Sequence, residues 1–85
     1  MPIICRFYGI IVMMYWRDHN PPHFPARYGG HEVEVNIRDG AFRGAMSRRA
    51  MAMIQAWRKA HTDELMGDWA LAQTGEELAG IDPLE

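Results

Sequence analysis

The sequence contains one cysteine, Cys5, so no disulfide bond can form within the chain. This excludes the small secreted domains that depend on disulfides, and a reducing cytoplasmic setting fits the chain. Cys5 lies in an apolar stretch, which favours a buried, unreactive thiol. A long hydrophobic run is also missing, because Arg6 interrupts the apolar residues 3–16 and the run is too short to span a bilayer. Residues 16–18 are bulky and charged, unlike a signal-peptide cleavage site, so we expect a cytoplasmic protein without a membrane partner.

Neither sign of charge is in large excess, because nine Lys and Arg residues stand against eleven Asp and Glu residues, a formal net charge of −2. The total therefore gives no overall attraction to nucleic acid or to an anionic membrane. The distribution is uneven, since all nine basic residues lie within residues 1–60 and the formal charges of residues 61–85 are all acidic. A local phosphate-binding patch and a merely solvated arginine surface are both open interpretations of the basic part.

The chain has 85 residues, the length of one small domain, so we expect residues 1–85 to form a single domain. Hydrophobic residues make up 48% of it and include three Trp and seven Met. A domain of this size buries a modest fraction of its surface and is only marginally stable alone. A small protein partner or a homo-oligomer is therefore compatible with the composition.

Apolar, β-branched and aromatic residues dominate the first part of the chain and predict strands over residues 3–8 and 10–16. Residues 24–28 and 31–37 predict a hairpin, whose Gly29-Gly30 connection suits a type I′ turn. A two-residue turn fixes the register, and side-chain alternation then divides the hairpin into two faces. The core face is predicted to hold Phe24, Ala26, Tyr28, Val33, Val35 and Ile37, and the opposite face His23, Pro25, Arg27, Glu32, Glu34 and Asn36.

Helical spacing of apolar residues follows the strands. Ser47 is a predicted N-cap for a helix over residues 48–60, and Thr62 is a candidate N-cap for a second helix over residues 63–73 that stops near Gly75. A short further strand is expected at residues 41–43, and an extended tail held by Leu78 and Ile81 follows the helices. Because strands precede helices, the predicted fold is α+β, an antiparallel sheet of three to five strands followed by two C-terminal helices packed on one face.

The segment from His19 to His23 reads His-Asn-Pro-Pro-His, which predicts two imidazoles on a stiff, extended turn. As metal ligands they need a third donor, and Asp18, Glu32, Glu34 and His31 are candidates. As acid–base groups near arginine they suit phosphodiester chemistry. In a purely structural role, His19 caps the turn and His23 begins a strand.

The residues proposed from the sequence fall into three groups. The catalytic candidates are His19, His23 and Arg27. The substrate-binding candidates are Arg17, Asn20 and Glu34. The metal-ligand candidates are His19, His23 and Glu32, although the spacing is not that of a zinc finger. A cross-strand ion pair between Arg27 and Glu32 on a solvated face is the alternative for those two residues. We expect no cofactor, and the sequence leaves open whether the protein is an enzyme.

Several of these segments resemble a known family. Arg6-Phe7-Tyr8-Gly9-Ile10, Met14-Tyr15, Asp18-His19-Asn20-Pro21-Pro22-His23-Phe24, Tyr28-Gly29-Gly30 and Leu84 after Asp82-Pro83 are similar to the small bacterial domain-of-unknown-function family 4160. Some members of that family are DhiT-type toxins of type II toxin–antitoxin pairs. The resemblance implies a small antitoxin-like protein partner and a toxin-like function, but it gives no substrate. Together with the shared location of His19, His23 and Arg27, it makes RNA or another phosphate-bearing molecule the candidate target.

One position departs from the family pattern, in which the segment usually reads His-Asn-Pro-Pro-His-Phe-His-Ala. By resemblance, His19 and His23 correspond to the first two histidines, but Pro25 stands where the third is expected. The predicted register places His31 on the opposite face, so it does not replace the missing imidazole. The site then works with two histidines and a carboxylate, or its function has drifted. Since proline lacks an N–H, we also expect its strand to be an edge strand.

Overall fold

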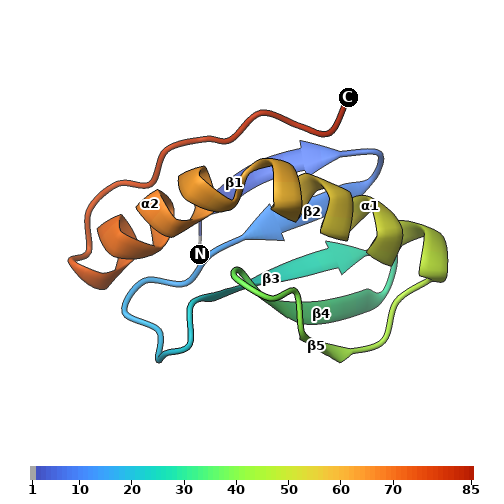
Figure 1. The fold of residues 1–85 in the computed structure, drawn as a ribbon, viewed down its shortest axis with the longest axis horizontal. Coiled ribbons are helices and arrows are strands. Elements are labelled where there is room, and N and C mark those ends of the chain that lie inside the picture. Colours follow the sequence, from blue (N-terminus) through green and yellow to red (C-terminus); the bar gives the residue numbers. More distant parts are fainter. Residues whose placement is uncertain (1) are drawn as a thin grey trace.

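A computed structural model describes residues 2–85 of the chain. Five strands come first: β1 (Ile3–Phe7), β2 (Ile10–Met13), β3 (His23–Tyr28), β4 (His31–Asn36) and β5 (Phe42–Gly44). Two helices follow: α1 (Arg48–Ala60) and α2 (Thr62–Gln73). The strands form one antiparallel sheet in the order β1-β2-β3-β4-β5, and the helices lie along one face of it (Figure 1). The predicted α+β layout is confirmed.

The central hairpin has the register that the sequence predicted. Tyr28 pairs with His31, and the pairing continues to His23 opposite Asn36. The core-face residues are buried except Tyr28, which is 37% exposed at the end of the strand. The turn differs from the expectation, since only Gly29 of the two glycines has a positive φ, 60°. That pattern belongs to a type II′ turn, and two successive positive φ values occur instead at Tyr8 and Gly9, between β1 and β2.

Three local predictions were wrong. Strand β2 ends at Met13, short of residue 16. Thr62 is the first residue of α2 and not its cap, because its hydroxyl donates a hydrogen bond to the Arg58 carbonyl of the preceding helix (2.8 Å). The strand that contains Pro25 is the middle strand of the sheet and not an edge.

The backbone pairing explains how a middle strand tolerates Pro25. Ile37 donates its N–H to the Pro22 carbonyl (3.0 Å), so residues 22 and 37 form a hydrogen-bonded pair at the end of the β3–β4 ladder. Antiparallel pairs alternate, which makes Pro25 and Glu34 a non-hydrogen-bonded pair. The Pro25 nitrogen therefore faces β2, where the paired register already ends at Ala26. No ladder bond is lost.

The core lies between the sheet and the two helices, with Trp57 of α1 near its centre. The Trp57 ring packs 5.6 Å from the Phe7 ring and 5.9 Å from the Phe24 ring, measured between centroids. Its Nε1 donates to the Asp82 carbonyl at 2.8 Å. Cys5 is buried beside this cluster, and burial raises the pKa of its thiol, as expected for an unreactive cysteine.

The C-terminal tail crosses the molecule as an extended segment, as predicted, and passes close to β1 (Figure 1). Ile81 is buried and donates its N–H to the Ile4 carbonyl of β1 (2.9 Å), while Leu78 packs against the core. Asp68 of α2 accepts a hydrogen bond from the Ala79 N–H (2.9 Å). Backbone bonds as well as apolar contacts therefore hold the tail. Among residues 2–85, neither helix has the length and apolar character needed to cross a membrane.

Candidate functional site

The candidate site begins in the loop between β2 and β3, which carries Asp18 and His19. Two contacts attach the start of this loop to the end of α2 and the residues after it. The Arg17 N–H donates to the Ala72 carbonyl (3.0 Å), and the Trp16 indole donates to the Glu76 carbonyl (3.0 Å). The loop ends where His23 begins β3, so a strand fixes one histidine and a loop presents the other.

Asp18 lies between the two histidines. Its Oδ1 is 2.9 Å from His19 Nδ1, and its Oδ2 is 3.0 Å from His23 Nε2. The Oδ1 atom also accepts the His19 backbone N–H at 2.8 Å. One ligand atom from each of the three residues lies within 4.8 Å of the others, so Asp18, His19 and His23 could hold a metal ion together. A single carboxylate thus connects both imidazoles.

The two imidazoles differ in how firmly they are held. The His23 side chain is only 10% exposed, and its ring lies 5.4 Å from the His19 ring and 5.4 Å from the Trp69 ring of α2. His23 Nδ1 is 2.7 Å from the Pro21 carbonyl oxygen, which can only accept a hydrogen bond, so Nδ1 carries a proton. The His19 side chain is 84% exposed. His23 is therefore enclosed and contacts protein groups through both ring nitrogens, whereas His19 is exposed and contacts Asp18 through Nδ1.

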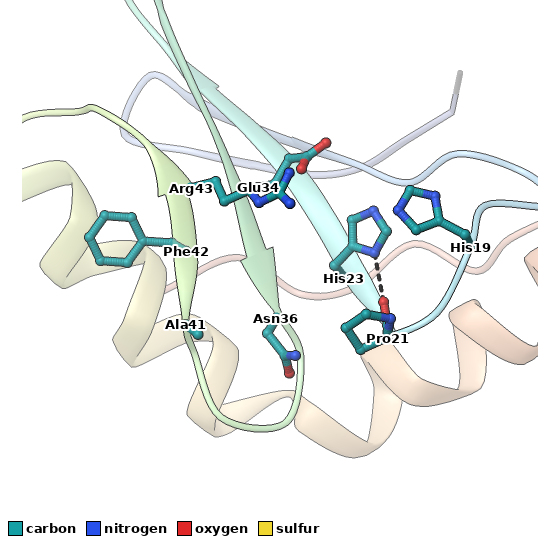
Figure 2. A pocket seen from close by; sticks show the side chains of 8 residues that line it. All are labelled: His19, Pro21, His23, Glu34, Asn36, Ala41, Phe42 and Arg43. Atoms are coloured by element: carbon teal, nitrogen blue, oxygen red, sulfur yellow. Dashed lines mark hydrogen bonds between the residues drawn. The ribbon is translucent and has the colours of Figure 1, made fainter.

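A pocket of about 230 Å³ opens beside the histidines. Figure 2 shows the two imidazoles side by side at one end and the Glu34 and Arg43 side chains together near its middle, while the Phe42 ring points outward at the far end. Glu34 and Arg43 are cross-strand partners on β4 and β5. The residues that line the pocket are His19, Pro21, His23, Glu34, Asn36, Ala41, Phe42 and Arg43.

The pocket contains only some of the residues proposed from the sequence. His19, His23 and Glu34 line it together. Arg27 and Glu32 lie near the other end of the hairpin, where Arg27 Nε is 2.6 Å from Glu32 Oε1. This hydrogen bond raises the pKa of Arg27, as in the cross-strand ion pair named as the alternative. Neither of the two is among the lining residues.

The other two substrate-binding candidates also lie apart from the pocket lining. Asn20 is exposed in the loop and does not line the pocket. The Arg17 guanidinium lies against the backbone at Gly75, where a methyl group on the glycine would be 2.6 Å from Arg17 Nη2.

Sequence reasoning missed part of the site. Asp18 was one of four open choices for a third donor, although its place directly before His19 was a usable signal. Arg43 was one of the arginines of the possible phosphate-binding patch but was not grouped with the histidines, because its place in the pocket depends on the pairing of β5 with β4, which no short-range pattern specifies. Asn36 was assigned to the correct face but to no function. The sequence predicted Trp69 as a core or interface residue, and in the structure its ring also packs against His23.

A model of the family described as Domain of unknown function (DUF4160) matches residues 9–70. The chain belongs to the DUF4160 family. The matched part contains the whole histidine loop and every residue that lines the pocket, whereas residues 6–8 and 84, which also carried the resemblance, lie outside it. No curated protein and no solved structure matches this DUF4160 domain.

Proposed function

We propose that this DUF4160 domain is the toxin-like component of a type II toxin–antitoxin pair. In this proposal it acts in the cytoplasm and binds RNA, or another phosphate-bearing target, in the pocket beside His19 and His23. The observation that carries the proposal is the convergence of two imidazoles and one guanidinium on one small hollow. The toxin-like part of the proposal rests on the resemblance to the toxin members of the family, since the family description itself gives no function.

The size and chemistry of the pocket suit a piece of a polymer backbone. Its volume of about 230 Å³ lies below the roughly 300–1,000 Å³ of typical small-molecule sites, so a phosphate and its sugar fit better than a whole cofactor. Arg43 offers a guanidinium, which binds phosphate oxygens in pairs. The Asn36 side-chain oxygen accepts from the Arg38 N–H (2.9 Å), which leaves its amide nitrogen available to donate.

In this proposal the arginine that acts with the two histidines is Arg43 and not Arg27, which the sequence predicted. The Arg27 guanidinium is bound to Glu32, outside the pocket, whereas Arg43 lines the pocket with both histidines. His19 and His23 then supply the reactive groups at the end of the pocket opposite Phe42. Their ring nitrogens can transfer protons or bind a metal ion, and both roles serve phosphodiester cleavage.

A small protein partner completes the proposal. Phe42 is 53% exposed beside the pocket, and Trp16 and Tyr15 are exposed where the histidine loop begins. Aromatic side chains of this kind are enriched in protein–protein interfaces. An antitoxin-like partner that covers Phe42 would also obstruct the pocket, which links partner binding to inhibition.

The test is inducible expression of His23→Ala and Arg43→Ala, each compared with a matched control outside the pocket, His31→Ala and Arg48→Ala. We expect the pocket variants to lose growth inhibition and to bind a labelled oligoribonucleotide more weakly, while the controls match the wild type. Circular dichroism of each purified variant confirms folding.

Two results would contradict the proposal. If folded pocket variants inhibit growth and bind the oligoribonucleotide as well as the controls do, the pocket is not the site. If His23→Ala only lowers the melting temperature, and growth inhibition per folded molecule is unchanged, His23 is a structural residue of an interaction module.

A further inference from the structure

We infer that Asp18, His19 and His23 form a binding site for one divalent transition-metal ion of the zinc type, at the end of the pocket. The inference deepens the proposed function, because the ion would contact the phosphate-bearing ligand, but the binding of metal alone does not depend on that function. It stands on the contacts of Asp18, the second contact of His23 and the position of the pocket.

Both ring nitrogens of His23 have an oxygen atom as their partner. The Pro21 carbonyl accepts a hydrogen bond from Nδ1, so Nε2 is the ring nitrogen left for a further partner. Nε2 faces the carboxylate oxygen Asp18 Oδ2 at 3.0 Å. A proton on Nε2 satisfies this contact, and so does a metal ion that replaces the proton, because metal binding to imidazole and carboxylate releases protons. A divalent ion in that place binds both atoms together.

The number and spacing of the ligand atoms also suit a zinc ion. Zinc binds imidazole nitrogen at about 2.0–2.1 Å and carboxylate oxygen at about 2.0–2.2 Å, which places neighbouring donors of a tetrahedron about 3.3 Å apart. The two nitrogen–oxygen contacts of Asp18 are 2.9 and 3.0 Å, so they need to open by only a few tenths of an ångström. The His19 ring is exposed and its Nδ1 already lies beside Asp18, so it needs only a small movement to complete the set.

The surroundings of His23 match those of a metal-binding histidine. Such histidines usually donate their second N–H to a carbonyl or carboxylate, which fixes the ring orientation, and here the Pro21 carbonyl accepts it. The buried Trp69 ring packs against the imidazole. The bond from Arg17 to Ala72 attaches the loop to α2. His23 and the groups that orient its ring are therefore already in the positions that metal binding requires.

The position of the pocket supplies the remaining coordination site. Three protein ligands with an open fourth position are characteristic of catalytic zinc sites. Both imidazoles line the pocket together with Glu34 and Arg43, whereas Asp18 is not among the lining residues, so we infer that the open position faces the pocket (Figure 2). A water molecule or a phosphate oxygen can occupy it.

The donor set does not need an imidazole at position 25. Pro25 is fully buried there, opposite Glu34. The third donor in this chain is the carboxylate of Asp18, the residue directly before His19. Two imidazoles among three donors favour zinc and its neighbours over Mg²⁺, which prefers oxygen ligands.

The test is isothermal titration of chelator-treated protein with zinc chloride, without RNA. We expect one site per chain, no binding of Mg²⁺, and simultaneous shifts of the His19 and His23 side-chain nitrogens in long-range proton–nitrogen spectra. Asp18→Asn keeps the shape of the side chain, and His19→Ala changes an exposed ring, so both variants are expected to fold. Because each variant removes a direct ligand, each should weaken zinc binding by at least the roughly 10- to 100-fold that is typical of losing a partner behind a ligand.

The matched control is a second contact of the same chemistry, between His61 Nδ1 and Glu64 Oε1 (2.6 Å). Glu64→Gln should bind zinc as the wild type does. If the wild type takes up no zinc, or if Asp18→Asn and His19→Ala bind it unchanged, the inference is wrong. Zinc binding at this site without any oligoribonucleotide binding would support the metal site and refute the proposed function. Oligoribonucleotide binding without zinc uptake would refute the metal site and support the proposed function.

Discussion

Asp68 makes the stability of this domain depend on pH in a direction opposite to that of most carboxylates. The side chain is 2% exposed, and its Oδ1 accepts the Ala79 N–H. Its Oδ2 is buried and has no hydrogen-bond partner among residues 2–85. Burial, with a smaller contribution from the charge of Glu64, raises the pKa of Asp68 above its ordinary value of 3.8, although the bond from Ala79 lowers it in part.

The direction in which stability changes with pH follows from proton binding by Asp68. Because the folded pKa is raised, the folded state binds the Asp68 proton more tightly than the unfolded state does. Stability from this group is therefore fully present below pH 3.8 and is lost as the pH rises from there through the folded pKa. One proton gives a slope of at most about 1.4 kcal/mol per pH unit. Above the folded pKa the contribution is constant.

Asp68→Asn removes the titration and keeps the acceptor for Ala79. We expect the free energy of unfolding of the variant, minus that of the wild type, to increase between pH 4 and neutral pH and then to level off. Urea unfolding followed by tryptophan fluorescence at each pH measures both. Glu77→Gln, which changes an exposed acid of the tail, is the control and should show no such increase. A constant or decreasing difference for Asp68→Asn refutes the reasoning.

Three further predictions concern local structure and are checked by the same unfolding assay. Gly44→Ala should destabilise the domain by several kcal/mol, because φ is +102° and a Cβ atom would lie 2.5 Å from the Glu32 carbonyl oxygen; a loss below about 1 kcal/mol contradicts this. Gly67→Ala should stabilise it by up to about 1 kcal/mol, because the position lies inside α2 and, apart from the local helix backbone, nothing lies within 4 Å of the new methyl group; any loss of stability argues against that account. Ser47→Ala should cost about 1 kcal/mol, since the Ser47 hydroxyl caps α1 through the Ala50 N–H (3.1 Å), and Ser47→Asp should restore it.

The elements that the sequence predicted well are those whose signals are local. Alternation of apolar and polar residues around Gly29 and Gly30 specified both the register and the two faces of the hairpin. Ser47 marked the start of α1 for the same kind of reason, because a cap contacts a backbone N–H only three residues away. Neither inference needs knowledge of distant parts of the chain.

The predictions that were wrong or incomplete depend on contacts between distant segments. The edge assignment of Pro25 followed from the missing N–H, but β2 and β4 flank that strand and the β2 pairing simply stops before the proline. Arg27 and Arg43 are equivalent in the sequence as cations near the hairpin. Only the order of the strands shows that Arg43 shares a pocket with the histidines.

The attachment of the histidine loop to the end of α2 and to the tail has a practical consequence. Ala72 and Glu76, which accept hydrogen bonds from Arg17 and Trp16, are followed by the tail segment that pairs with β1 at Ile81. We therefore expect an affinity tag or a truncation at the C-terminus to disturb the contacts that hold the histidine loop, and with them the candidate site. Assays of metal or RNA binding should use protein tagged at the other terminus, or with the tag removed.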